Sequence, residues 1–189
     1  GAEADLRVDV RNYALHGATW LQLKTDGFIR ARAQRVGLVL GVATAVLFGL
    51  AGIWVAQLNG YQLLGSIDTN GPSNPLNKSV ELVAGGWVKN YSLYSWMIAA
   101  PVLGVVGALA CAWFSAKARA GWAFLSSSLA IAGVILTAGF SMFPFLMPSS
   151  TMPGASLTVW DSVSSQRTLG IMLWATVLLM PIIIAYTSW

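Results

Sequence analysis

Four long stretches of the chain contain no charged residue, and they constrain the fold more than any other feature. They cover residues 36–58, 92–115, 121–143 and 168–188. A helix of about 20 residues crosses the hydrocarbon core of a bilayer, which is about 30 Å thick. Charged residues make up only 10% of the chain, whereas about 25% is usual in soluble domains. We therefore predict an all-α integral membrane protein with four transmembrane helices.

The part before the first stretch differs in character. Residues 1–15 are polar and cannot span a bilayer, whereas residues 16–35 carry apolar residues at about helical spacing and end in a basic cluster. This pattern predicts a segment that lies at the membrane surface or extends the first transmembrane helix. We accordingly divide the chain into residues 1–35, a polar stretch with a surface helix, and residues 36–189, a four-helix transmembrane bundle.

The second apolar stretch contains residues with specific packing habits. Pro101 is expected to kink its helix, and Gly104, Gly107 and Ala108 suit close helix packing. Cys111 is the chain's single cysteine, so it forms no internal disulfide and is expected to be a small buried hydrophobe.

Two long connections, residues 59–91 and 144–167, join apolar stretches on the same side of the expected membrane. The first has Asn–Gly and Asn–Pro turn signals, and a short helix is predicted between Asn77 and Val88. The second is rich in prolines and hydroxyl groups. Connections of this length are more often functional or docking loops than filler. We predict that structural or partner-contact residues lie here: Asn74, Pro75, Asn77, Lys78, Pro144, Pro148, Ser149, Ser150, Thr151, Trp160 and Asp161.

Asp161 is the one acid of the second connection. The preferred interpretation is that it caps a short helix or the start of the fourth apolar helix. A role in ligand binding or subunit contact is the alternative. Lys78 is a candidate ion-pair partner for Asp161 if the two connections meet.

The four apolar stretches contain no Asp, Glu, Lys, Arg or His. Proton relays and ion pathways in membranes usually use such groups, so this chain is not expected to carry a proton wire on its own. Ser126, Ser127 and Ser128 favour contacts between helices, with a polar pathway as the second interpretation.

The sequence predicts neither a catalytic residue nor a metal ligand in this chain. His16 is the only histidine, and transition metals usually need more than one imidazole. A structural or surface histidine is therefore preferred over a haem or metal ligand. Methionines in apolar helices serve packing far more often than ligation.

The charges predict the topology. Arg30, Arg32, Arg35, Lys117 and Arg119 lie next to apolar stretches on one side. The positive-inside rule places this side, and with it both ends of the chain, in the cytoplasm. The net charge of +4 is explained by these helix ends and does not indicate nucleic acid.

Three separated motifs resemble a known family. The first is His16-Gly-Ala-Thr-Trp-Leu-Gln-Leu-Lys-Thr-Asp-Gly27, and the second is Gly60-Tyr61 followed by Ser73-Asn-Pro-Leu-Asn-Lys78. The third runs from Ser141 to Leu169 and contains Met-Pro-Ser-Ser-Thr151 and Trp160-Asp161. In this order, they resemble the second subunit of cytochrome bd quinol oxidase over roughly residues 16 to 189.

The resemblance implies a function. The family is a bacterial respiratory oxidase of the cytoplasmic membrane that moves electrons from quinol to dioxygen through three haems. The haem ligands and the substrate quinol site belong to subunit I, so no haem is expected to bind this chain directly. Subunit II is implied to be a haem-free partner that shields the haem subunit and supports its assembly. In some members it also holds a structural quinone.

One departure from the family pattern stands out. In the family, a complete transmembrane helix leads into the His16 motif, whereas here an outer-loop-like sequence precedes it. Our hypothesis is that a spanning helix has been lost between about Arg11 and Tyr13. The resemblance also implies that the chain is the C-terminal half of the subunit, without the N-terminal half that carries the family's acidic proton-path residues. The alternative functions are a small four-helix transporter or channel-like protein, and a lone lipid- or quinone-binding module.

Overall fold

The computed structural model describes residues 2–65 and 78–188, with side chains from Tyr13 onward in these ranges. Contacts divide the chain into two compact units. Unit 1 comprises Gly1–Leu64 and Val80–Phe143, and unit 2 comprises Gly65–Ser79 and Pro144–Trp189.

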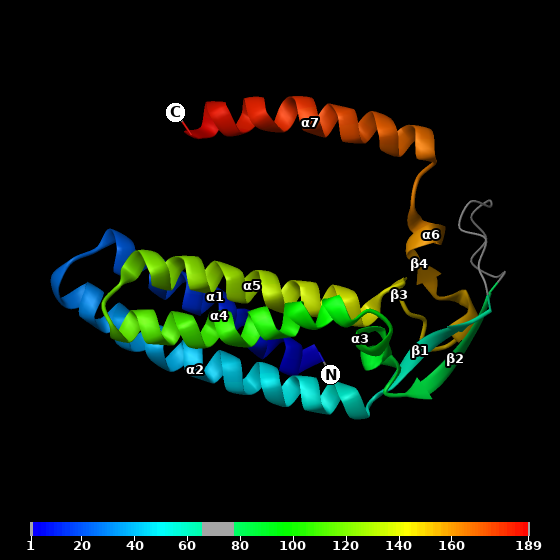
Figure 1. Cartoon of the computed structure of the whole chain (residues 1–189), viewed down its shortest axis with the longest axis horizontal. Coiled ribbons are helices and arrows are strands. Elements are labelled where there is room, and N and C mark those ends of the chain that lie inside the picture. Colours follow the sequence, from blue (N-terminus) through cyan, green and yellow to red (C-terminus); the bar gives the residue numbers. More distant parts are fainter. Residues whose placement is uncertain (1, 66–77, 189) are drawn as a thin grey trace. The chain divides into compact units, whose positions relative to one another are not determined.

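Unit 1 is built from four long helices that lie side by side (Figure 1). They are α1 (Ala2–Lys24), α2 (Gly27–Gln57), α4 (Ala99–Ala116) and α5 (Ala120–Met142). α1 contacts α2 and α5, and α4 also contacts α2 and α5. The four helices therefore form a closed ring of contacts.

The prediction of an all-α membrane protein with four apolar helices is confirmed. Within the described part of the chain, the helices long and apolar enough to cross a membrane are Gly27–Gln57, Ser95–Ala116, Ala120–Met142 and Gln166–Ser188. The first begins nine residues before the uncharged stretch, so the basic segment at its start extends the helix. Pro101 falls in the first turn of α4, just after the 3-10 helix η2 (Ser95–Ile98). A proline is tolerated at that position, so the expected mid-helix kink is replaced by a change of helix type.

α1 differs most from the sequence-based expectation. It is helical from Ala2 onward and packs along α2 and α5. Leu15, Ala18, Thr19 and Gln22 are all buried, and their spacing puts them on one face of the helix. Because two of these residues are polar, hydropathy alone does not reveal the buried face. The proposed division of the chain at residue 35 stays a prediction.

α4 and α5 approach each other through small residues, as expected for Gly104, Gly107 and Ala108. A Cβ atom at Gly133 would lie 2.7 Å from Cα of Gly104 and 2.9 Å from the carbonyl oxygen of Ala100. A Cβ atom at Gly107 would lie 2.8 Å from the backbone nitrogen of Ala130. These backbones therefore leave no room for a side chain. Cys111 is fully buried in the same helix, as predicted.

The first long connection contains a β-hairpin. β1 (Asn59–Leu64) pairs with β2 (Ser79–Ala84), and the short helices η1 (Gly86–Val88) and α3 (Lys89–Leu93) follow. The predicted helix between Asn77 and Val88 is therefore wrong. β1 supplies the backbone hydrogen-bonding partner for this segment, and a partner so far away in the sequence does not appear in a local pattern.

α3 attaches this connection to α5. Nδ2 of Asn90 donates to the carbonyl oxygens of Phe140 and Phe143, at 2.8 and 2.5 Å. The hydroxyl of Tyr91 donates to the carbonyl oxygen of Thr137 at 2.9 Å. The Asn90 bonds satisfy carbonyl groups at the end of α5, which have no partner within the helix.

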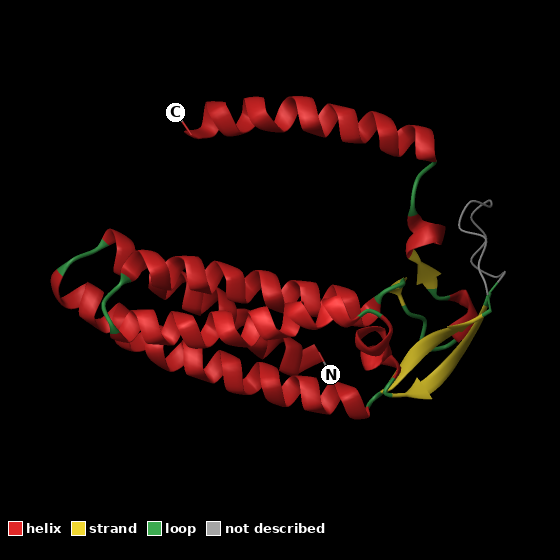
Figure 2. Cartoon of the chain, viewed as in Figure 1, coloured by secondary structure: helices red, strands yellow, loops and turns green. Residues whose placement is uncertain are grey.

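Unit 2 contains the second long connection and the last apolar helix. Its elements are β3 (Phe145–Met147), η3 (Pro153–Ala155), β4 (Leu157–Thr158), α6 (Val159–Ser162) and α7 (Gln166–Ser188). Figure 2 shows that the described strands lie in the connections and not among the long helices.

Candidate functional site

The second connection folds back on itself to form a small antiparallel hairpin. Phe145 pairs with Thr158, and Met147 pairs with Leu157, with an irregularity between the two pairs. The backbone N–H of Val159 donates to the carbonyl oxygen of Pro144 at 2.8 Å. Pro144 needs no donor in this arrangement, because it takes part only as an acceptor. The hairpin thus brings the Pro144 end of the connection beside the start of α6.

Asp161 stabilises the turn into α6. Its Oδ2 atom accepts hydrogen bonds from the backbone N–H of Thr158 at 3.0 Å and from the Thr158 hydroxyl at 2.6 Å. Thr158 is the N-cap of α6, and Asp161 is its third residue, which is the capping-box arrangement. Asp161 therefore has the helix-capping geometry expected from the sequence. The helix it caps is the short α6.

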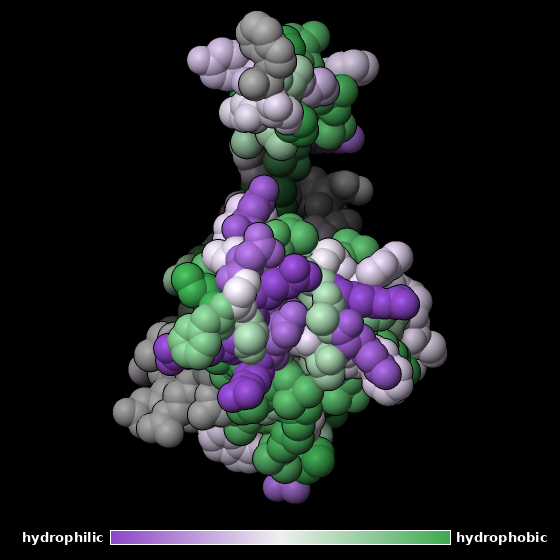
Figure 3. All heavy atoms as spheres, turned by 90° about the vertical axis from the view of Figure 1, so that its left-hand side faces the viewer, coloured by the Kyte–Doolittle hydropathy of each residue, from purple (hydrophilic) through white to green (hydrophobic). Residues whose placement is uncertain are grey.

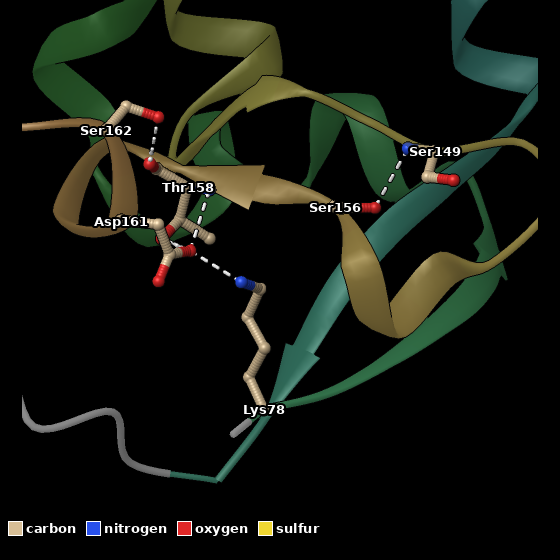
Figure 4. A network of polar contacts seen from close by, with 6 residues as sticks. All are labelled: Lys78, Ser149, Ser156, Thr158, Asp161 and Ser162. Atoms are coloured by element: carbon tan, nitrogen blue, oxygen red, sulfur yellow. Dashed lines mark hydrogen bonds and ion pairs between the residues drawn. The ribbon is translucent and has the colours of Figure 1, made fainter. Parts of the chain in front are cut away.

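Lys78, which belongs to the first connection, joins Asp161 and Thr158 in one polar cluster. Its Nζ atom lies 2.5 Å from Oδ2 of Asp161 (Figure 4). The two side chains are only 2% and 9% exposed, so the pair is buried although both residues belong to polar connections. The conditional prediction of a Lys78–Asp161 pair is met, because the two connections do meet at this point.

The environment of Asp161 keeps it ionised. Burial raises its pKa, but hydrogen bonds from Lys78 and Thr158 and the charge of Lys78 act in the opposite direction and prevail. The pKa of this carboxyl is therefore held below its ordinary value. A carboxylate that accepts three hydrogen bonds at one oxygen is a structural anchor and a poor general base.

A second set of polar contacts orders the turn between β3 and β4. Oγ of Ser156 accepts a hydrogen bond from the backbone N–H of Ser149 at 3.0 Å (Figure 4). Oγ of Ser149 accepts one from the backbone N–H of Met152 at 3.2 Å and lies 3.5 Å from Oγ1 of Thr151. Ser156 is fully buried, whereas Thr151 is exposed. The hydroxyl groups of this connection thus replace backbone partners in its turns.

The remaining candidates of the second connection surround these contacts. Pro148 and Trp160 are half-buried, and Ser150 is exposed. Asn74, Pro75 and Asn77 lie outside the described residues. The structure brings Lys78, Thr158 and Asp161 together in one cluster, and the predicted contact with a partner stays a prediction.

The sequence favoured contacts between helices for the serine run but did not identify the partners of these serines inside unit 1. Nδ1 of His16 lies 2.8 Å from Oγ of Ser127, and Oγ1 of Thr19 lies 3.0 Å from the same atom. The His16 ring also stacks on Phe124, with a centroid distance of 4.6 Å. The signal for this contact is the spacing of His16 and Thr19 on α1, together with the serine run on α5. His16 thus joins α1 to α5, and the preference for a structural over a ligand role stays a prediction.

A second polar contact joins α1 to α2 and α4. Nε2 of Gln22 donates to the carbonyl oxygen of Ala33 and to Oγ of Ser115, both at 3.1 Å. Gln22 is 1% exposed and Ser115 is also 1% exposed. Hydrogen bonds of this kind hold helices together in membranes, where water offers no alternative partner.

Side chains that commonly bind metals do not cluster among the described residues. Within residues 2–65 and 78–188, no group of three or more His, Cys, Asp and Glu side chains could hold a metal ion. The one histidine already contacts Ser127 and Phe124.

One end of the unit 1 bundle is basic. Figure 3 shows hydrophilic residues gathered at the end where α1 meets α2 and α4 meets α5. Arg30 links the two turns, since its Nη2 atom donates to the carbonyl oxygen of Ala118 at 3.5 Å. Three aromatic rings lie beside cations at this end. The pairs are Lys24 with Trp20, Arg32 with Phe28 and Lys117 with Trp113. Aromatic and basic residues of this kind mark a membrane–water interface.

Comparisons with known proteins identify similar sequences. Residues 9–189 match the family described as cytochrome bd terminal oxidase subunit II. The chain is 46% identical over 183 residues to cytochrome bd-I ubiquinol oxidase subunit 2 of Escherichia coli (strain K12), which covers 96% of this chain and 48% of the relative. It is 45% identical over 174 residues to the probable cytochrome oxidase subunit 2 of Haemophilus influenzae, which covers 92% of this chain and 46% of the relative. The chain thus spans about half the length of the curated relatives it matches.

Proposed function

The chain belongs to the cytochrome bd terminal oxidase subunit II family, and we propose that it acts in the haem-free second subunit of a cytochrome bd-type quinol:dioxygen oxidoreductase. The observation that carries this proposal is the family match over residues 9–189. The proposed complex lies in the bacterial cytoplasmic membrane and transfers electrons from quinol to oxygen in aerobic respiration. Its haems belong to subunit I, the partner.

We assign this chain a role in assembling and shielding the haem-bearing subunit. Its polar groups support that role, because the Lys78–Asp161 pair and the His16–Ser127 contact hold elements together. The outer face of α2 carries the apolar side chains of Val39, Val46 and Leu50, which are 54–61% exposed. Such a face suits lipid or an apolar subunit surface. We propose that the chain is non-catalytic by itself.

A quinone with a structural role is the cofactor we propose for this subunit. The proposal rests on the family alone, and the described residues do not assign it a position. Subunit I and membrane lipid are the other proposed partners.

Purification of the tagged chain from bacterial membranes tests the function. We expect a haem-bearing partner to copurify, with haem absorption bands and oxygen consumption driven by ubiquinol. A matched preparation from cells that lack the gene for this chain should lose haem from the partner. Purification of the chain alone, together with ion flux in liposomes, would replace this proposal by the transporter or channel function.

We further propose that the basic end of unit 1 faces the cytoplasm and that the second connection faces outward. The support is the set of cations at the α1–α2 and α4–α5 turns. α1 and α2 are joined by only Thr25 and Asp26 and pack together, so they run in opposite directions. Ala2 then lies away from the basic end, which argues against a cytoplasmic position for the start of α1. The end of α7 stays assigned to the cytoplasm as a prediction.

Cysteine labelling separates the two orientations. A membrane-impermeant maleimide added to intact spheroplasts should label Ser150→Cys and spare Ala118→Cys. Opening the membrane should make both positions reactive. The native Cys111 is buried and provides the background control. Labelling of Ala118→Cys in sealed spheroplasts would reverse the assigned orientation.

A further inference from the structure

An apolar groove lies between α1 and α2, close to the turn that joins them. Its volume is about 250 Å³. α1 contributes Ala18 and Leu21, and α2 contributes Phe28, Ile29, Arg32 and Val36. The groove belongs entirely to unit 1, and nothing in the function proposed above uses it.

The groove is open at its side. Leu21, Ile29 and Val36 are 46%, 56% and 46% exposed, whereas Ala18 and Ala33 at its base are 7% and 6% exposed. Small residues at the base and large ones at the rim produce a furrow between two helices. A flexible hydrocarbon chain suits such a furrow, because it can follow the contact line of the two helices.

Arg32 supplies a charge at the groove. Its guanidinium lies 5.5 Å from the centre of the Phe28 ring. The ion pairs of the described residues join Arg30 to Asp26 and Lys78 to Asp161, so neither of them includes Arg32. The guanidinium therefore keeps its hydrogen-bond donors for an external acceptor, and its planar fork matches a phosphate.

The surroundings of Arg32 favour an anion. Lys24 lies at the end of α1, and Arg35 lies one turn after Arg32 on α2. The nearby acid is Asp26, which is highly exposed and lies 3.5 Å from Nη1 of Arg30. Arg32 also stands four residues before Val36, where the uncharged stretch begins. That position corresponds to the level of lipid headgroups when α2 crosses a bilayer.

We propose that this groove binds an anionic phospholipid, with its phosphate at Arg32 and one acyl chain along the apolar wall formed by α1 and α2. A neutral quinone would use the groove but gains little from the surrounding cations. A phospholipid gains from both features, because its acyl chain fits the apolar groove and its phosphate is attracted by the cations. The occupant is therefore a lipid of the cytoplasmic leaflet, in the orientation proposed above.

Native mass spectrometry of the chain, purified from membranes with any partner that copurifies, tests the site. The protein is placed in micelles doped with phosphatidylglycerol or, separately, with phosphatidylcholine. We expect the wild-type protein to retain phosphatidylglycerol over phosphatidylcholine. Arg32→Gln should weaken retention by about tenfold, the effect of losing one charge-assisted contact. Arg32→Lys should restore part of it.

Two further variants sharpen the result. Arg119→Gln removes the same charge at the same end of the bundle but outside the groove, and it should retain lipid like the wild type. Leu21→Trp fills the groove without changing charge, and it should also lower retention. Three results would each overturn the proposal. The wild type and Arg32→Gln could retain phosphatidylglycerol equally, or the wild type could show no preference between the two lipids. Arg32→Gln could also lose copurified quinone while it keeps the lipid.

Discussion

The ammonium group of Lys78 lies 2.5 Å from the carboxylate of Asp161, although 83 positions separate the two residues in the sequence. Both side chains are almost fully buried. The same carboxylate oxygen also accepts two hydrogen bonds from Thr158. One oxygen atom thus joins the end of the first connection to the helix cap in the second.

Removal of either charge should destabilise this junction. Lys78→Met leaves a buried carboxylate without its cation, and Asp161→Leu leaves a buried ammonium. Each should cost about 3–5 kcal/mol, as is typical when one partner of a buried pair is lost. The measurement is equilibrium unfolding in mixed detergent micelles. Ser150→Ala is the control, because Ser150 is exposed and lies in the same connection as Asp161. It should change the free energy of unfolding little.

The double variant isolates the pair from the helix cap. Lys78→Met with Asp161→Leu removes both charges and should recover most of the loss. The double variant should remain about 1 kcal/mol less stable than the wild type, because the capping contact with Thr158 is gone as well. Simple addition of the two single losses would contradict a direct interaction between Lys78 and Asp161.

Asp161 should titrate at an unusually low pH. Its folded-state pKa is lowered below the ordinary value of 3.8 by the bonds that outweigh burial. The stability that these bonds contribute is therefore fully present above the ordinary value and is lost as the pH falls through the lower, folded value. Carbon-13 NMR of labelled aspartate carboxyl groups can follow the protonation of Asp161, because the chain has only five aspartates. Asp161→Asn identifies the signal, and Lys78→Met should move the midpoint upward.

The long helices were predictable because lipid leaves few choices. A stretch of about 20 apolar residues must satisfy its own backbone in a bilayer, and a helix does so within the segment. The small residues at Gly104 and Gly107 were informative for the same reason, since close packing of membrane helices needs them. Both features are local in the sequence, and both appear in the structure.

Features that depend on distant partners were not predictable in the same way. The segment Ser79–Ala84 is a strand because β1 pairs with it, and the local pattern suggested a helix. The buried face of α1 includes Thr19 and Gln22, whose partners lie on α4 and α5. Lys78 and Asp161 were recognised as a conditional pair, but only the folded chain shows that their connections meet.

Gly133 should tolerate no side chain. In Gly133→Ala, the new Cβ atom would lie 2.7 Å from Cα of Gly104 and 2.9 Å from the carbonyl oxygen of Ala100. Both obstacles are backbone atoms, so α4 and α5 would have to separate. We expect a loss of about 1–3 kcal/mol in detergent unfolding.

Gly139→Ala is the matched control on the same helix. Apart from the neighbouring residues and backbone of its own helix, no atom lies within 4 Å of a Cβ atom at this position. Alanine is favoured over glycine in helices by about 0.5–1 kcal/mol, so this variant should be neutral or slightly stabilised. A similar loss in both variants would mean that helix propensity or lipid contact, and not the α4–α5 approach, decides the effect.

Ser127 should contribute more to stability than its neighbour Ser128. Both serine hydroxyls donate to the carbonyl oxygen of Phe124 in their own helix, at 2.7 Å for Ser127 and 3.0 Å for Ser128. Oγ of Ser127 is in addition within hydrogen-bond distance of His16 and Thr19 of α1. Ser127→Ala leaves Nδ1 of His16 without this partner, while the Thr19 hydroxyl keeps its bond to the carbonyl oxygen of His16. The loss of stability should be about 1–3 kcal/mol. Ser128→Ala should cost well under half of that, since its helix keeps every backbone bond. Unfolding in mixed micelles measures both variants.

If the contact between α1 and α5 depends on Ser127, His16→Ala should add little further loss to Ser127→Ala, because the two residues act through one interaction. Independent, additive losses would show that His16 stabilises the bundle through its stack on Phe124 instead.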